Sequence, residues 1–487
     1  MLFTRDKFLR MRRRDESKHF LVIGDTGVGK STFIRQILHY AQNCGDTCVV
    51  LDSKLEFIPE FFNPRRQDRI LSPKDERCVW WDFRAEVTDE VDATLVSRSM
   101  YPAHPEQQYQ GKWFDDQACA IAAYLWTYSD PRPTCEQFAR WLCDPVNEIL
   151  PRLKGSEHLI TLNTAAANQF SGVQSTMGQV GKALRMMPRD SEKHCRQLFT
   201  IRSWAQDPQG WLFLPNTAET RDALRPLQSG LVDMCIARIM SSPQRVRRVW
   251  IVLDELDSLG TLSKLHEGMT QLRSSGHPMV LGVQNVSQLE GRYGKQAKTI
   301  VSQAFTKLIF AVSEPDSAKT LEQFFGEVEI RRFRESRTGS LWGGHDRNNF
   351  SGPEDIRKPA ILASQVQGLP DLNGYFVQRP SDDGDGLHIV KVKLPWEQPI
   401  YRDRPLVERA IPAMNAPVAE ASTTAPVHLQ TLNSTLSPKA ACVIASTKAP
   451  PPVPSRLTWT GGTTTAEAPK PAAVAPQPAS QAELSFE

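Results

Sequence analysis

The sequence predicts an α/β fold with a mainly parallel sheet that is interrupted by an all-α domain. Three observations support this prediction. From residue 19 to about 87, short apolar runs alternate with helical patterns, as in a βαβ unit. Between about 88 and 199 the segments have helical spacing and contain no convincing strand. Strand patterns then return from 210 to 312, so one α/β domain with a helical insertion explains the order most simply.

Length and composition are those of a globular protein with two or three domains. The chain has 487 residues, of which 40% are hydrophobic and 23% charged, and its formal net charge is +3. Any affinity for nucleic acid must therefore come from local basic clusters. Nine cysteines occur without a CxxC pair, which indicates reduced, cytoplasmic thiols. No uncharged apolar stretch reaches the roughly 18–20 residues of a membrane-spanning helix.

Both ends of the chain differ from the rest. We expect a basic leader at 1–17, because the first 18 residues carry seven basic side chains. Such a leader either stays solvated or contacts the phosphates of a membrane or of DNA. We assign 401–487 to a disordered tail. From Pro412 onward this tail holds 12 of the 35 prolines and only eight charged residues. A segment of this composition cannot bury enough apolar surface to offset the entropy lost on ordering.

Between these ends we expect the α/β domain at 18–87 and 200–400, and the all-α domain at 88–199. The first elements are a strand (HFLVIG, 19–24), a helix (30–43) and a strand (TCVVLD, 47–52). Four later runs predict further strands: GWLFLP (210–215), RVWIVLDE (248–255), PMVLGVQ (278–284) and KLIFAV (307–312). Helical spacing within the insertion is clearest at 115–129 and 174–187, and we expect Trp113, Tyr124, Trp126 and Tyr128 in its core.

A phosphate-binding loop lies between the first predicted strand and helix. The segment fits G-x-x-x-x-G-K-[ST] at every fixed position, and strand–loop–helix is the context that the motif requires. Its residues are Gly24, Asp25, Thr26, Gly27, Val28, Gly29, Lys30 and Ser31, followed by Thr32, which could support the base of the loop. Glycines let backbone N–H groups surround a phosphate, and the helix dipole adds positive charge. We expect Lys30 to meet the β- and γ-phosphates and Ser31 to bind Mg²⁺.

The strand at 248–255 ends in Asp254 and Glu255, which is the Walker B pattern. Asp254 is expected to order the magnesium shell, and Glu255 to polarise a water for attack on the γ-phosphate. An Asp-Glu pair after a strand can also be an ordinary helix cap, but the upstream loop favours the catalytic interpretation. Because no NKxD guanine-reading motif occurs, ATP is preferred over GTP.

Two further polar residues are candidates for the same site. Gln284 follows the next strand, at the edge where ligands of open α/β sheets bind, and could sense the γ-phosphate. Arg273 ends the predicted helix TLSKLHEGMTQLRSS and lies off its apolar face. An arginine there either complements the helix dipole or stabilises charge on a transferred phosphoryl group, within one chain or across a subunit boundary.

In these residues the chain resembles the type IV secretion coupling proteins, ATPases that deliver DNA to conjugative transfer machinery. The similarity extends over about 18–395 and includes VVLDSKLEF (49–57), SPKDERCVWWDF (72–83), GLPDLNGYFV (368–377) and the long blocks at 199–233 and 250–294. It implies a RecA-like domain with an all-α insertion, a ring of six subunits with ATP between neighbours, and DNA in a central channel. By the same resemblance, Lys30, Ser31, Asp254 and Glu255 carry the ATP chemistry, Gln284 matches the family's glutamine, and Arg273 matches a proposed arginine finger.

The resemblance also implies partners: single-stranded, relaxase-linked DNA, the relaxosome and the proteins of the secretion channel. Family members commonly begin with a pair of transmembrane helices, whereas this sequence starts a few residues before its first strand. We therefore expect a cytoplasmic protein without a transmembrane segment in this sequence. Either it reaches the inner membrane through partners, or the anchoring part lies on another chain or outside this sequence.

A basic and aromatic stretch follows the last predicted strand of the sheet. It reads as a loop and contains Arg331, Arg332, Phe333, Arg334, Arg337, Trp342 and Arg347. Such mixtures suit single-stranded nucleic acid, but an exposed loop or a subunit contact has the same composition.

The sequence thus predicts an ATP-driven DNA-translocating motor. Two alternatives remain open: a nucleotide-dependent adaptor that recruits protein substrates, and a DNA pump for packaging or chromosome handling.

Overall fold

The computed structural model divides into two compact units, Met1–Pro417 and Val418–Glu487. It describes residues 2–3, 8–9, 11, 13–101, 109–161, 167–242, 247–338, 347–378 and 388–411. All elements below belong to the first unit, because the second lies outside these residues. No helix in these ranges combines the length and apolar character needed to cross a bilayer.

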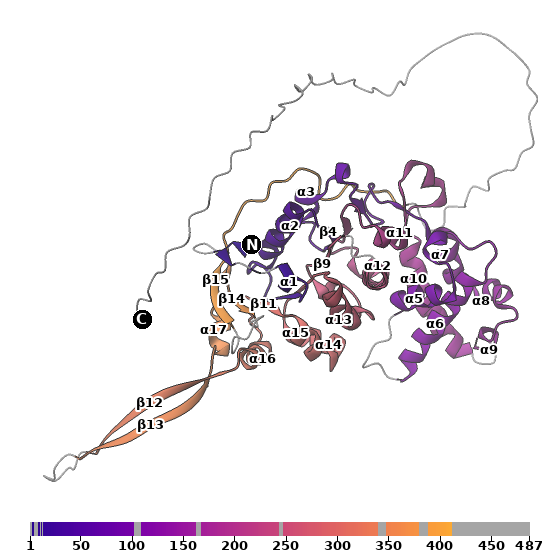
Figure 1. The fold of residues 1–487 in the computed structure, drawn as a ribbon. Helices are drawn as coiled ribbons and strands as arrows, with labels where there is room; N and C mark the ends of the chain where they lie inside the picture. The colour runs from indigo at the N-terminus through magenta and orange to yellow at the C-terminus, as the bar shows by residue number, and fades with distance from the viewer. Residues whose placement is uncertain are drawn as a thin grey trace, which may run out of the picture. The chain divides into compact units, whose positions relative to one another are not determined.

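A nine-stranded sheet forms the α/β domain (Figure 1). In spatial order the strands are β15 (His388–Lys393), β14 (Asn373–Gln378), β11 (Thr306–Ile309), β3 (Phe20–Ile23), β10 (Met279–Val283), β9 (Val249–Leu253), β4 (Thr47–Asp52), β8 (Leu212–Pro215) and β5 (Arg69–Ile70). The seven strands from β11 to β5 are parallel, and β14 pairs antiparallel with both of its neighbours. All six strands that the sequence predicts are in this sheet.

Helices cover both faces of the sheet, and the alternation of side chains along β3 separates two cores. Phe20 and Val22 pack with Phe33 and Ile37 of α2, whereas Leu21 and Ile23 belong to the core on the opposite face. Central strands that are buried on both faces explain the continuous apolar runs of the sequence. The helices of this domain are α1 (Arg13–Glu16), α2 (Lys30–Cys44), α3 (Ile58–Phe61), α11 (Ile201–Gln206), α12 (Arg221–Ser241), α13 (Leu265–Ser275), α14 (Val286–Tyr293), α15 (Gln296–Gln303), α16 (Pro315–Phe325) and α17 (Ala363–Gln367).

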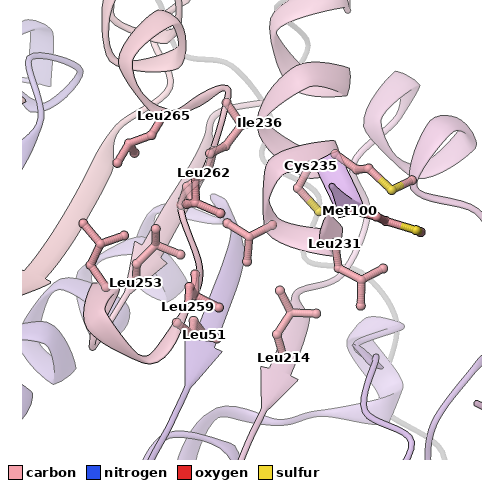
Figure 2. Close-up of a cluster of buried hydrophobic side chains, with 14 of the residues drawn as sticks. Leu51, Met100, Leu214, Leu231, Cys235, Ile236, Leu253, Leu259, Leu262 and Leu265 are labelled. Atoms are coloured by element: carbon pink, nitrogen blue, oxygen red, sulfur yellow. The ribbon is translucent and has the colours of Figure 1, made fainter. Parts of the chain in front are cut away.

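The second core joins the sheet to the inserted helices. Figure 2 shows Leu51, Leu214 and Leu253, from three neighbouring strands, together with Leu231 and Cys235 of α12. Met100, the last residue of α5 in the insertion, belongs to the same cluster. Burial of this continuous apolar surface fixes α12 between the α/β domain and the insertion.

The insertion leaves and re-enters the α/β domain through a two-stranded parallel pair, β6 (Trp80–Trp81) and β7 (Leu198–Phe199). Trp126 is fully buried against the Phe83 ring, with ring centroids 3.8 Å apart. Trp113 and Tyr124 are only partly buried, and Tyr128 is 58% exposed, so the prediction that it lies in the core is wrong. The inserted helices are α4 (Phe83–Glu86), α5 (Glu90–Met100), α6 (Tyr109–Thr127), α7 (Cys135–Cys143), α8 (Val146–Ile149), α9 (His158–Thr161) and α10 (Ala167–Leu184).

The basic and aromatic stretch is a β-hairpin, not the loop that its polar composition predicts. Strands β12 (Glu327–Thr338) and β13 (Arg347–Pro359) pair antiparallel as a two-stranded sheet of their own (Figure 1). Ion pairs between Arg331 and Asp355 and between Arg357 and Glu329 link its strands near the base. Trp342 lies outside the described residues.

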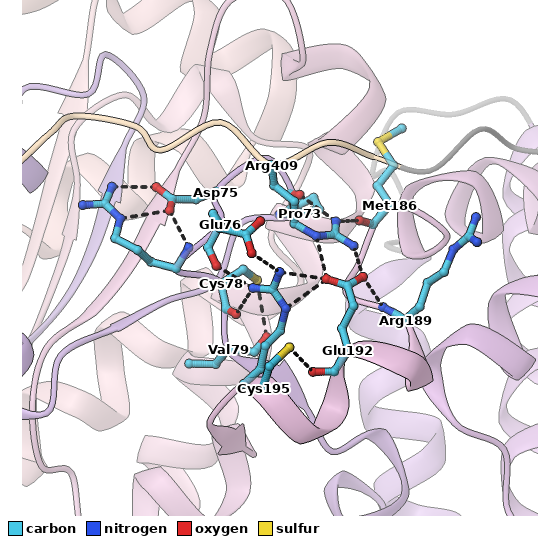
Figure 3. A network of polar contacts seen from close by, with 12 residues as sticks. Pro73, Asp75, Glu76, Cys78, Val79, Met186, Arg189, Glu192, Cys195 and Arg409 are labelled. Atoms are coloured by element: carbon cyan, nitrogen blue, oxygen red, sulfur yellow. Dashed lines mark hydrogen bonds and ion pairs between the residues drawn. The ribbon is translucent and has the colours of Figure 1, made fainter. Parts of the chain in front are cut away.

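Residues 395–411, here called the C-terminal strap, are ordered, although the sequence places 401–411 in the tail. Arg402 and Asp403 donate backbone hydrogen bonds to Pro59, and Glu76 donates one to Val407. At the end of the strap the Arg409 side chain is 2% exposed and reaches Glu192, Pro73 and Met186 (Figure 3). These hydrogen bonds and ion pairs hold the strap on the domain, and sequence patterns do not reveal such contacts.

The end of the basic leader also contacts the domain. Arg13 lies 2.9 Å from a carboxylate oxygen of Asp46, and Lys18 lies 2.6 Å from one of Asp15. These two basic side chains are therefore paired with carboxylates of the chain itself.

Candidate nucleotide-binding site

The strand register brings the predicted site residues to one edge of the sheet. Val283 of β10 is aligned with Ile23 of β3, and Leu253 of β9 is aligned with Leu51 of β4. Because these strands are parallel, the residues that follow them meet at their common carboxyl edge. The phosphate-binding loop, Asp254, Gln284 and the turn after β4 all begin there.

Contacts to neighbouring strands hold the base of the phosphate-binding loop in place. Gly24 has a φ of 155°, and a Cβ at this position would lie 2.7 Å from the Cβ of Phe310, so a side chain is excluded. The amide of Asp25 donates to Ala311 at 2.9 Å. The Asp25 carboxylate in turn accepts hydrogen bonds from the amide and hydroxyl of Ser313, at 2.8 and 2.5 Å.

The loop has the donors that a chain of phosphates requires. Within the described residues, the amides of Thr26, Gly27 and Gly29 donate no hydrogen bond. The Lys30 ammonium donates to the carbonyls of Gly24 and Asp25, at 2.5 and 2.8 Å, across the mouth of the loop. Burial lowers the pKa of Lys30, and the nearby charge of Lys54 lowers it further. Free amides, a desolvated ammonium and the start of the 15-residue helix α2 fit a phosphate group.

Asp254 is buried at the end of β9, and one of its oxygens lies 3.5 Å from the Ser53 hydroxyl. Burial raises its pKa to about 7, and the Lys54 charge opposes that rise. Ser31 lies in the first turn of α2. A hydroxyl and a carboxylate, completed by phosphate oxygens and water, are the ligands that Mg²⁺ prefers, so these residues fit that ion. The described part of the chain contains no cluster of three or more His, Cys, Asp or Glu residues suited to a metal.

Glu255 has protein groups near both of its carboxylate oxygens. Gln284 donates to Oε1 at 2.8 Å, and an Arg221 nitrogen lies 4.0 Å from Oε2. Gly282 makes the approach of β10 to β9 possible, because a Cβ there would lie 2.0 Å from the Asp254 carbonyl. Glu255 and Gln284 are thus held together by two adjacent strands.

Arg273 is not at this edge. It is exposed near the end of α13, one helical turn after Met269, whose carbonyl lies 2.6 Å from the His19 ring. Because His19 directly precedes β3, Arg273 lies at the amino edge of the sheet, opposite the phosphate-binding loop. It borders a cavity of about 440 Å³ that Arg14, Lys18 and Gln303 also line. Within one chain, Arg273 therefore does not join Lys30 and Asp254.

Three residues at this carboxyl edge are absent from the site residues that the sequence predicts: Ser53, Lys54 and Arg221. Ser53 and Lys54 follow β4 in the run TCVVLDSK, a strand that ends in polar residues as the Walker B strand does. That signal could have identified them. Arg221 begins α12 after an ordinary-looking polar turn, and only the strand order β9-β4-β8 brings it near Glu255.

Comparison with known proteins settles the family. A family model described as the type IV secretion-system coupling protein DNA-binding domain matches residues 8–395. The chain belongs to the type IV secretion coupling protein family. It is 28% identical over 371 residues to the coupling protein TraD of Escherichia coli (strain K12), a match that covers 74% of this chain and 51% of TraD. The chain thus spans about half the length of this relative.

Solved structures of the coupling protein TrwB share the fold. The unbound, monoclinic form of TrwBdeltaN70 is 26% identical, with a TM-score of 0.72, and the match covers 82% of this chain and 89% of TrwB. TrwB in complex with ADP and Mg²⁺ is 25% identical, with a TM-score of 0.70 and the same coverage. TrwB with the ATP analogue ADPNP has a TM-score of 0.71 at 25% identity, covering 84% of this chain and 92% of TrwB. The predicted RecA-like fold is therefore confirmed.

Proposed function

We propose that this coupling protein hydrolyses ATP and uses the energy to move DNA into a transfer channel. The observation that supports it most is the convergence of the phosphate-binding loop, Asp254, Glu255 and Gln284 at one edge of a RecA-like sheet. TrwB, which shares this fold, has been solved with ADP and Mg²⁺ and with an ATP analogue. The proposal includes ATP as substrate and Mg²⁺ as cofactor.

Each side chain has a distinct role. The free amides of the loop and the Lys30 ammonium hold the β- and γ-phosphates. Ser31 and Asp254 hold Mg²⁺, which when bound neutralises charge on the phosphates and orients them. Glu255 accepts a proton from the attacking water, and Gln284 holds the Glu255 carboxylate while facing the γ-phosphate.

Arg273 acts on a neighbouring subunit. Its place at the opposite edge of the sheet leaves it too far from its own loop but available to a second copy. In a ring of six subunits, the amino edge of one copy faces the catalytic edge of the next, and Arg273 stabilises charge on the transferred phosphoryl group there. This arrangement makes hydrolysis depend on assembly.

The client is single-stranded, relaxase-linked DNA, delivered with the relaxosome to the channel proteins at the inner membrane. The match to a family model described as a DNA-binding domain supports DNA as a partner. We assign part of the DNA contact to the β12–β13 hairpin, since the distal half of its sequence is rich in arginine with interspersed aromatic residues.

An ATPase assay over a range of protein concentrations tests the proposal. We expect turnover per subunit to rise with protein concentration and with added single-stranded DNA, and to be absent from Lys30→Ala protein. If added DNA does not change turnover, and deletion of 412–487 abolishes the recruitment of protein substrates, the alternative function as a nucleotide-dependent adaptor would be favoured. DNA-stimulated turnover that relaxase and channel proteins leave unchanged would favour a pump with another client.

A further inference from the structure

A tightly built turn follows β4 at the catalytic edge. The carboxylate of Asp52, which is fully buried, accepts hydrogen bonds from the amides of Glu56, Phe57 and Ile58, at 2.8–2.9 Å. Leu55 has a φ of 58°, a left-handed conformation that is uncommon for a residue with a large side chain. Strain of this kind persists where the surroundings impose it and is frequent at functional sites. The turn thus has a fixed shape that presents Ser53 and Lys54 at the edge.

Lys54 is exposed on this turn and has no ion pair or hydrogen bond with any residue of the described ranges. Three carboxylates at this edge have other partners. The Asp52 carboxylate accepts hydrogen bonds from backbone amides, and the Glu255 carboxylate accepts one from Gln284. Asp254 lies beside the Ser53 hydroxyl. The ammonium therefore remains available to a ligand that reaches the edge.

The position of Lys54 relative to the other charges also supports a role in binding a ligand at this edge. Among charged groups, it has the largest effect on the pKa of Asp254 and also on that of Lys30, lowering both. Lys54 also directly follows Ser53, whose hydroxyl lies 3.5 Å from an Asp254 oxygen, and β4, which precedes it, is aligned with β9. It therefore lies at the same edge of the sheet as the carboxylate that would hold Mg²⁺, and its charge acts on the lysine of the phosphate-binding loop. A γ-phosphate that extends from the loop toward Asp254 would lie between the two lysines.

We propose that Lys54 is a second phosphate-binding lysine, which contacts the γ-phosphate from the β4 side of the site while Lys30 contacts it from the loop. This inference rests on the proposed ATPase function. A flexible ammonium can follow the γ-phosphate as charge moves to its oxygens, which is where phosphoryl transfer needs stabilisation. ADP has no γ-phosphate, so Lys54 distinguishes the triphosphate from the product. Lys30 also serves the β-phosphate and does not distinguish them in this way.

Binding measurements on the full chain test this role separately from turnover. We would titrate ADP and a non-hydrolysable ATP analogue, each with Mg²⁺, into the wild type, Lys54→Ala, Lys54→Arg and, as a matched control, Lys154→Ala, which removes an exposed lysine in the insertion. For Lys54→Ala we expect analogue affinity to fall roughly tenfold while ADP affinity stays within twofold of wild type, which is about the scatter between such measurements. Lys54→Arg should restore most of the loss.

Equal weakening for ADP and the analogue would overturn the proposal, because it would mean that Lys54 only balances the surrounding carboxylates. No weakening for either would overturn it too. Lys30→Ala serves as the reference and should lose both nucleotides. A wild-type chain that binds both nucleotides but never hydrolyses ATP would refute the ATPase function and leave the Lys54 contact standing, so the two failures can be told apart.

Discussion

Glu255 is the side chain on which the proposed chemistry depends, and its position follows from the strand that carries it. An apolar run fixes β9 in the sheet, so the acidic pair that follows it must emerge at the carboxyl edge. This is why Lys30, Asp254 and Glu255 could be identified from the sequence: each belongs to a local motif beside a recognisable strand. Lys54 could have been recognised from the polar residues that end the β4 run, but Arg221 could not, since its proximity to the site depends on the order of β4, β8 and β9, which no local pattern encodes.

Two substitutions should separate nucleotide binding from hydrolysis. Lys30→Ala removes the ammonium from the loop and should reduce nucleotide affinity and turnover together. Glu255→Gln keeps the shape of the side chain but not the base, so we expect nearly normal affinity with turnover lower by roughly 10²–10⁴-fold. Calorimetric titration and a steady-state ATPase assay measure both quantities, with Glu267→Gln on α13 as the control. Normal turnover of Glu255→Gln would remove this residue from the mechanism.

Arg273 can be tested by mixing two inactive variants. Arg273→Ala lacks the finger but keeps Glu255, and Glu255→Gln has the opposite defect. Each alone should lose at least roughly 10²-fold in turnover. If Arg273 acts on a neighbour, mixed assemblies contain boundaries with both groups intact, and turnover should partly return on mixing. An Arg273→Ala protein that hydrolyses ATP normally, or mixtures without recovery, would contradict the role in trans.

At the scale of elements, hydrophobic periodicity predicts the strands and helices that are buried. It does not predict segments that are held in place by backbone pairing or polar contacts at the surface. Strands β3, β4, β8, β9, β10 and β11 are apolar because both faces are covered, and all were predictable. In the β12–β13 hairpin, the described residues 327–331 are all exposed, so burial there does not produce the apolar pattern by which a strand is identified. The C-terminal strap is ordered by polar contacts, which leave no periodic trace.

The ion pair between Arg409 of the strap and Glu192 should stabilise the fold against unfolding to an extent that depends on pH. Burial alone would raise the pKa of this carboxyl, but hydrogen bonds from Arg409, the Arg189 amide and Arg196 lower it from 4.5 to about 2 (Figure 3). Because the folded-state pKa is depressed, the contribution is present above pH 4.5 and is lost as the pH falls toward 2. Glu192→Gln should reduce the free energy of unfolding by about 2 kcal/mol at pH 7.

Chemical denaturation of wild type and Glu192→Gln across this range measures the difference. We expect it to shrink steadily below pH 4.5, while Glu267→Gln, at an exposed and weakly paired position, shows little difference at any pH. A difference that stays constant down to pH 3 would show that the Arg409–Glu192 contact does not stabilise the fold through its charge.

At the scale of the whole molecule, one family model covers residues 8–395, which include both parts of the RecA-like domain and the inserted helices. The nucleotide edge, the Arg273 edge and the hairpin lie on different elements of one unit, and in the proposed function they cooperate through other copies and DNA. Because the chain spans about half the length of TraD, functions carried by the remainder of that relative do not follow from the similarity.

Shortening the hairpin should weaken DNA binding and leave the domain folded. Val328 and Lys358 are directly paired, so a short turn can replace 329–357. We expect a lower affinity for single-stranded DNA and a shallower dependence on salt, since fewer phosphates are neutralised. Fluorescence anisotropy at several salt concentrations measures both, and thermal unfolding checks the fold. An unchanged affinity and salt slope would assign the hairpin to another contact.

The most direct test of the central claim is displacement of streptavidin from the end of a biotinylated single-stranded DNA. Movement along DNA driven by hydrolysis predicts displacement by the wild-type chain with ATP and Mg²⁺, at a rate that follows ATP turnover. It predicts none with a non-hydrolysable analogue or with Glu255→Gln. A chain that binds DNA and hydrolyses ATP but never displaces streptavidin, or that displaces it equally well without ATP, would contradict the claim that hydrolysis drives translocation.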